Sequence, residues 1–114
     1  MLIGYADKEI EKICTKQKAA MKKFPQTIAA LIPDRLADLA AFDNLGQIPY
    51  RQTPLHFHAL GDNRSGEFSL RLKDGFCITV APAGEFTSRD DGTPDLATVT
   101  SVEVRFIGNY HANA

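Results

Sequence analysis

Residues 67–80 read EFSLRLKDGFCITV. On both sides of Lys73-Asp74-Gly75, apolar residues alternate with polar ones, as in strands that have one buried face and one open face. The Asp-Gly pair is typical of the tight turns that join two such strands. The apolar positions are Phe68, Leu70, Leu72, Phe76, Ile78 and Val80. This stretch therefore predicts an antiparallel hairpin with one face in the core.

The alternation continues in the flanking sequence. Residues 55–60 show it before a segment of turn-forming residues at 61–66, and a last strand is expected at about 97–107, after a long polar loop at 82–96. In that last strand we expect Val102, Val104 and Phe106 on one side. The face predicted to pack on helices carries Phe57, Phe68, Leu70, Phe76, Ile78 and Val104. The opposite, polar face carries His56, His58, Arg71, Lys73 and Cys77.

The sequence before residue 45 predicts a short strand and two helices. Leu2, Ile3 and Tyr5 suggest the strand, and Asp7 can cap a helix that continues towards Met21. A second apolar stripe predicts a helix from about residue 25 to 42, with a kink or a break into two short helices at Pro33. We therefore expect an α+β fold: two N-terminal helices packed on a small antiparallel β-sheet, in one domain over residues 1–114.

Composition excludes several classes of protein. No apolar run approaches the roughly 18 residues of a membrane span, and the first residues do not have the pattern of a signal peptide. Two cysteines are too few for a disulfide scaffold and too far apart for a CxxC metal site, so we expect a cytoplasmic protein without cofactor, metal or membrane partner. The net charge is −1, although residues 1–35 carry +3 and residues 83–103 carry −4.

Three residues are candidates for proton transfer. His58 lies on the predicted polar face, and Tyr110 and His111 follow the last strand, whose end can approach the middle of another strand. Two imidazoles and a phenol can serve as general base and general acid. Phosphate binding is assigned to Arg64, Arg71 and Lys73. Together these side chains suggest metal-free cleavage of RNA, in which the neighbouring 2′-hydroxyl is the nucleophile.

A zinc site is the alternative use of the histidines. His56 and His58 share one strand face, and His111 could supply a third ligand. No carboxylate or thiol ligand is clearly placed beside them, so the nuclease hypothesis is preferred. Metal analysis of the purified protein separates the two hypotheses.

Three segments carry a resemblance to a known family. They are Ile10-Glu11-Lys12-Ile13-Cys14-Thr15, the pattern His58-x-Leu60-x-x-x-Arg64-x-Gly66-x-Phe68-Ser69-Leu70, and the ending Tyr110-His111. In these segments the chain resembles the HigB-type branch of the RelE/ParE toxin superfamily. The resemblance covers nearly the whole chain apart from the loop at 82–96, and the family's small sheet with two helices agrees with the expected fold.

The resemblance implies the toxin of a type II toxin–antitoxin system. Such toxins enter the ribosomal A site and cut the mRNA there, and an antitoxin encoded alongside silences them. The expected partners are therefore the ribosome, mRNA and an antitoxin of the helix-turn-helix, HigA-like kind. By position, His58 matches the motif histidine, Arg64 the basic residue of the turn, and Tyr110 and His111 the last two residues of the Asp-Tyr-His ending.

The chain departs from the family pattern at four positions. Asn109 replaces an Asp, Cys77 replaces an Arg that would neutralise the scissile phosphate, Gly61 replaces a frequent Lys, and His56 a frequent Arg. Loss of one charge-stabilising donor can lower a rate about a hundred- to a thousand-fold. The second hypothesis is therefore a catalytically impaired relative that still binds an antitoxin. A third, a gyrase poison like the ParE branch, has less support, because the hairpin motif and the ending resemble HigB.

Overall fold

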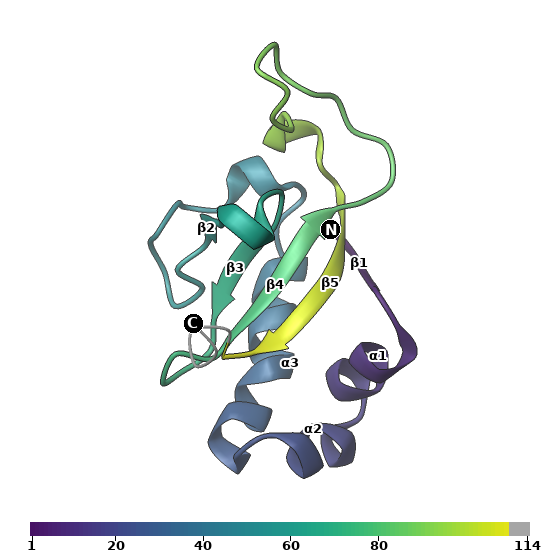
Figure 1. Ribbon diagram of the computed structural model, residues 1–114, viewed down its shortest axis with the longest axis vertical. Coiled ribbons are helices and arrows are strands. Elements are labelled where there is room, and N and C mark those ends of the chain that lie inside the picture. The colour runs from purple at the N-terminus through teal and green to yellow at the C-terminus, as the bar shows by residue number, and fades with distance from the viewer. Residues whose placement is uncertain (110–114) are drawn as a thin grey trace.

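The computed structural model describes residues 1–109, which form a mixed sheet with helices on one face (Figure 1). In chain order the elements are β1 (Leu2–Tyr5), α1 (Lys8–Thr15), α2 (Gln17–Lys23), α3 (Gln26–Ala40), β2 (His58–Ala59), β3 (Phe68–Arg71), β4 (Cys77–Pro82) and β5 (Ser101–Gly108). Short 3₁₀ turns lie at Leu45–Gln47, Asp62–Arg64 and Leu96–Thr98. Within this part of the chain, the α+β class is confirmed with three helices and five strands.

The sheet has the strand order β1-β5-β4-β3-β2. Strands β2 to β5 are antiparallel as predicted, but β1 runs parallel to β5, with Leu2 opposite Ser101 and Tyr5 opposite Val104. The expectation of a purely antiparallel sheet is therefore wrong. It rested on short hairpin links, which set the direction of consecutive strands only, whereas β1 and β5 are joined by most of the chain.

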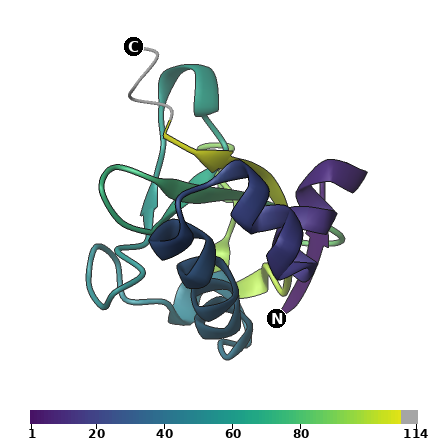
Figure 2. The ribbon, with the colours of Figure 1, turned by 90° about the horizontal axis from the view of Figure 1, so that it is seen from below.

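The predicted first helix is two helices. Asp7 caps α1 as expected, because its side chain accepts a hydrogen bond of 2.8 Å from the Ile10 amide. The Thr15 hydroxyl donates to the Glu11 carbonyl at 2.7 Å, and the next residue, Lys16, has extended backbone angles. Helix α1 therefore ends before Lys16 and α2 begins at Gln17, so two short helices precede α3 (Figure 2). Helices α1 and α2 together are called the helical arm below.

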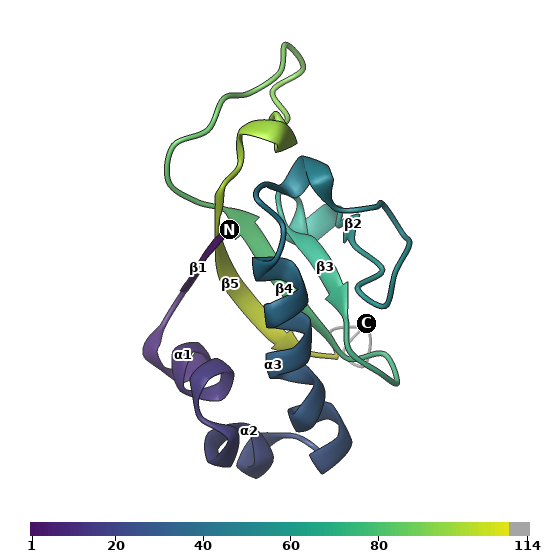
Figure 3. The same ribbon diagram turned by 180° about the vertical axis from the view of Figure 1, so that it is seen from behind.

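Helix α3 is continuous through Pro33, so the expected break there is wrong. Pro33 is exposed, and the ring therefore does not disturb the buried stripe of this helix. The stripe consists of Ile28, Ala29, Ile32, Leu36 and Leu39, and it lies across one face of the sheet (Figure 3). This face is the inner face, and the other is called the outer face below.

The core lies between α3 and the inner face. Five of the six residues predicted for that face are buried, and Phe76 is half-buried against the same cluster. Phe106 is the exception within β5. A β-bulge places Phe106 opposite Thr79 but Val104 opposite Val80, so that Arg105 is the extra residue. The bulge reverses the alternation, and Phe106 therefore lies on the outer face rather than beside Val102 and Val104.

Residues 55–60 form less strand than the alternation predicts. Only His58 and Ala59 pair with β3, because the chain turns before them with positive φ angles at Arg51, Thr53 and His56. Leu55 and Phe57 are buried nonetheless. The turning segment brings His56 beside His58 at the edge of the outer face.

Candidate active site

A row of side chains crosses the outer face. His58 of β2 pairs with Ser69 of β3, Ser69 with Thr79 of β4, and Thr79 with Phe106 of β5. Two residues further along β3, Arg71 pairs with Cys77, which lies opposite Gly108. The period-two alternation that builds the core therefore also collects polar groups on the opposite face.

A hollow of about 580 Å³ opens at the end of this face where β3 turns into β4. Its lining includes His56, His58, Ser69, Arg71, Lys73, Asp74, Phe76 and Cys77. The structure thus brings together His58, Arg71 and Lys73, three of the residues proposed from the sequence. The hollow is an open, charged surface of the kind that suits a polar substrate.

His58 is held in one tautomer. Its Nδ1 lies 2.8 Å from the carbonyl oxygen of His56. A carbonyl oxygen can only accept a hydrogen bond, so Nδ1 carries the proton and, in the neutral ring, Nε2 carries the lone pair. The His56 backbone that supplies this carbonyl has a positive φ of 44°, in the left-handed region. His58 therefore has the form that a general base requires.

The ring of His56 lies next to that of His58, with centroids 5.1 Å apart. Loss of hydration in the folded chain lowers the pKa of His56, and the nearby charges of Arg71 and Arg51 lower the pKa further. His56 is therefore mainly neutral at pH 7. Its backbone carbonyl, rather than its imidazole, is the group that orients His58, a role that no sequence pattern indicated.

Arg71 and Lys73 supply the positive charge of the hollow, and both side chains are exposed. The backbone of Arg71 is fixed on both sides: its amide donates to the Leu55 carbonyl at 2.7 Å, and its carbonyl accepts from Arg35 Nε at 3.0 Å. Neither Arg71 nor Lys73 forms an ion pair within residues 1–109, although Asp74 lines the same hollow. Both cations are therefore positioned to contact phosphate oxygens.

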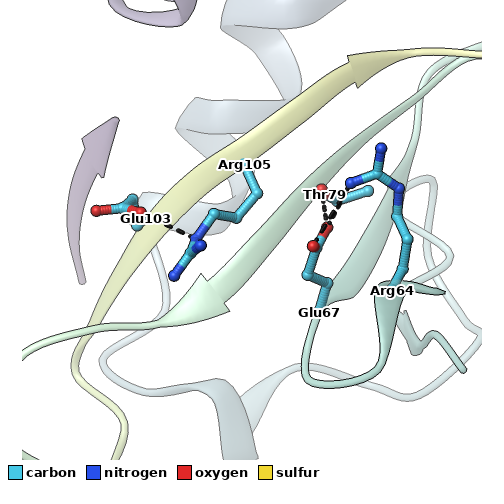
Figure 4. Close-up of polar contacts among 5 residues, drawn as sticks. All are labelled: Arg64, Glu67, Thr79, Glu103 and Arg105. Carbon is cyan, nitrogen blue, oxygen red and sulfur yellow. Dashed lines mark hydrogen bonds and ion pairs between the residues drawn. The ribbon is translucent and has the colours of Figure 1, made fainter. Parts of the chain in front are cut away.

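Arg64 lies elsewhere on the outer face, and the hollow is not lined by it. Its guanidinium donates to Glu67 at 3.1 Å (Figure 4). The same guanidinium lies 4.1 Å from the centroid of the Phe106 ring. The hydroxyl of Thr79, a fully buried residue, donates to the same Glu67 oxygen at 2.6 Å. This cluster of ion pair, hydrogen bond and ring contact holds the β2–β3 turn against β4 and β5, and sequence reasoning missed its Glu67 and Thr79. Their signal was present, because both fall on polar positions of the alternation.

Besides His56, two of the positions that depart from the HigB-type pattern adjoin the hollow. Cys77 is buried, and burial raises the pKa of its thiol, so the side chain is neutral where the family has a cation. Asn109 donates from Nδ2 to the Asp74 carbonyl at 3.4 Å and packs on Gly75, where an added Cβ would lie 2.8 Å from Nδ2. The end of β5 is thereby attached to the turn that forms the rim.

Tyr110 and His111 lie outside the described residues, so their predicted roles stay predictions. The zinc hypothesis needs His111 as well, and within residues 1–109 no three side chains of His, Cys, Asp or Glu gather in a group that could hold a metal. Over the same residues, no helix combines the length and apolar character that crossing a membrane requires. No family model, curated protein or solved structure matches this chain.

Proposed function

We propose that this protein is a metal-independent endoribonuclease and the toxin of a type II toxin–antitoxin system, with a fold of the RelE/ParE kind. It acts in the cytoplasm on mRNA in the ribosomal A site and thereby inhibits translation. The observation that carries the proposal is the geometry of His58, whose Nδ1 donates to the His56 carbonyl and leaves Nε2 as the proton acceptor in a cationic hollow. The resemblance to HigB-type toxins supports the same activity.

The chemistry needs no group beyond the RNA and the protein. His58 Nε2 accepts the proton of a ribose 2′-hydroxyl, and the 2′-oxygen attacks the adjacent phosphorus. The bond from phosphorus to the 5′-oxygen breaks, which leaves a 2′,3′-cyclic phosphate and a 5′-hydroxyl. The leaving oxygen takes its proton from a general acid, a role that the resemblance gives to His111, with Tyr110 assisting.

Arg71 and Lys73 stabilise negative charge and do not transfer protons. Negative charge builds up on the non-bridging oxygens as the 2′-oxygen attacks, and fixed cations stabilise it more in the transition state than in the substrate. Both side chains line the hollow that contains His58, so a phosphate bound there lies near all three residues. Arg64, which already bonds Glu67, has a weaker geometric argument for phosphate binding and remains a prediction from the motif.

The test uses purified protein, translating ribosomes and primer extension on the mRNA. We expect His58→Gln to lower the cleavage rate about 10²- to 10⁴-fold, because a positioned proton acceptor contributes that much. His111→Ala should lower it as well, and Arg89→Ala, in the distant 83–95 loop, should leave it unchanged. Cleavage at the wild-type rate by the His58 and His111 variants would disprove these roles.

A catalytically impaired binding module is the second candidate, and the buried neutral thiol of Cys77 favours it. In that case the chain binds a helix-turn-helix antitoxin but cuts slowly. Cys77→Arg is the discriminating variant, because it restores the cation of the family pattern beside Arg71. A rise in cleavage of tenfold or more supports the impaired form, whereas fast cleavage and growth arrest by the unaltered protein exclude it.

A further inference from the structure

The small net charge of this protein conceals a separation of charge along its longest axis. Residues 8–23, which form α1 and α2, carry six lysines and two glutamates, a local charge of +4. Residues 85–95 carry four carboxylates and one arginine, a local charge of −3. Helices α1 and α2 lie at one end of the 43 Å axis, and the loop lies at the other (Figure 1).

The lysines of this helical arm are available to a partner. All six are exposed, namely Lys8, Lys12, Lys16, Lys18, Lys22 and Lys23. Of these six lysines, only Lys23 forms an ion pair within residues 1–109, with Glu9 at 2.5 Å. Lys18 and Lys22 stand one helical turn apart, so their like charges face the same side of α2 and repel each other unless an anion lies between them.

The loop at the opposite end of the long axis, residues 85–95, is negatively charged and contains several hydrogen bonds. In the 85–95 loop, Asp91 accepts hydrogen bonds from the amide and the hydroxyl of Thr93, and the bond from that hydroxyl lowers the pKa of Asp91. The Arg89 amide donates to the Thr93 carbonyl at 2.7 Å, and the Asp95 amide to that of Thr87 at 2.8 Å. Hydrogen bonds therefore cross the acidic loop, which lies at the end remote from the lysines.

The candidate active site belongs to the positive end. Phe76 lines the hollow, and its ring meets Phe24, the residue that follows α2, edge to face with centroids 6.0 Å apart. Lys22 and Lys23 immediately precede Phe24, so the arm adjoins the hollow through this aromatic contact. A phosphate-rich surface that attracts the arm therefore lies close to the hollow, and it repels the acidic loop.

We infer that the lysine surface of α1 and α2 binds the phosphate backbone of RNA and orients the protein with its hollow towards the substrate. The inference rests on the proposed function for its choice of RNA over another polyanion. The RNA can be the strand to be cut or a folded segment of ribosomal RNA, because both present the same phosphates. A charge dipole of this kind accelerates and orients association without requiring a large net charge.

The experiment measures binding of a single-stranded 12-mer and of an RNA hairpin by fluorescence anisotropy between 50 and 200 mM KCl. In Lys18→Ala/Lys22→Ala, we expect the slope of log K against log salt to become shallower by about 1.4 for the single strand and about 1.8 for the duplex. Arg89→Ala/Arg105→Ala removes the same charge elsewhere and should leave the slope unchanged. The RNA whose slope changes by its full expected amount identifies the source.

Three results of the anisotropy experiment would overturn the inference: an unchanged slope in the lysine variant, an equal change in the arginine variant, or no binding by the wild type at 50 mM salt. Retention of the protein on phosphatidylserine vesicles through these lysines, with RNA binding intact, would assign the surface to a membrane and also overturn it. His58→Gln separates this question from catalysis. It should lose cleavage and keep the salt slope, so failure of the nuclease proposal leaves a different signature from failure of the docking surface.

Discussion

The two faces of the sheet differ in what holds them together. The inner face is apolar throughout, with Leu70, Ile78, Val80 and Val104 fully buried against α3. The outer face is held by the bonds among Arg64, Glu67 and Thr79, and it opens into the hollow around His58. The apolar core therefore lies on one face and the candidate site on the other, so substitutions in the core and in the hollow should have separable effects.

The largest effect is expected on the inner side. Phe57 is 1% exposed, and its ring is stacked on Phe68 with centroids 5.1 Å apart. Phe57→Ala leaves a cavity between the sheet and the preceding loop, and we expect a loss of about 3–5 kcal/mol in the free energy of unfolding, measured by urea denaturation. Phe86→Ala, in the exposed loop, is the matched control and should cost less than about 1 kcal/mol. Equal losses in both would contradict the assigned core.

The second largest effect is expected from Arg71→Ala, which should lower the cleavage rate and leave stability unchanged. Arg71→Ala removes an exposed cation from the hollow but keeps the backbone bonds of that residue to Leu55 and Arg35. We expect a fall of about 10²-fold in mRNA cleavage, comparable to the loss of one charge-stabilising donor. Urea denaturation should show a change within about 0.5 kcal/mol, since the side chain is exposed. A loss of stability instead of activity would place Arg71 among the structural residues of the outer face.

A smaller effect tests whether the outer face contributes to stability through polar contacts. Thr79→Val keeps the shape of a buried side chain and removes the 2.6 Å hydrogen bond to Glu67. A buried bond to a charged acceptor predicts a loss of about 1.5–2 kcal/mol in the free energy of unfolding. Thr93→Val removes a bond of the same length to Asp91 on the exposed loop, where water replaces it, and should change stability by less than about 0.5 kcal/mol.

Local periodicity accounts for what the sequence could predict of the fold. Alternation around Asp74-Gly75 gave the β3–β4 hairpin and its buried residues, and the helical stripe gave α3. The parallel pairing of β1 with β5 joins segments about 100 residues apart, and no local pattern contains that information. The bulge at Arg105 is a single inserted residue, and it reverses the face of Phe106 without any change in composition.

Part of the candidate site was also predictable from the alternation of polar and apolar residues. His58, Arg71 and Lys73 lie on alternate polar positions near one end of the sheet, and the structure brings them to one hollow. The backbone turn at His56, with its positive φ, could not be foreseen, because a histidine in an alternating segment predicts an extended conformation. The His56 carbonyl in that turn fixes the tautomer of His58, so the decisive contact of the candidate site is one that side-chain patterns do not report.

The smallest expected effect is a shift in the pKa of His56, which lies beside His58. Loss of hydration and the nearby charge of Arg71 lower the pKa of His56, so the folded state takes up a proton there less readily than the unfolded state. Stability from this residue is therefore present above the ordinary histidine pKa of about 6.5 and declines as the pH falls through that value. An NMR titration of the imidazole Cε1–H signals should give His56 a midpoint below that pKa. Arg71→Ala should move the midpoint upwards, and Arg89→Ala should leave it in place; an unmoved midpoint in Arg71→Ala would mean that the cation does not face the histidine pair.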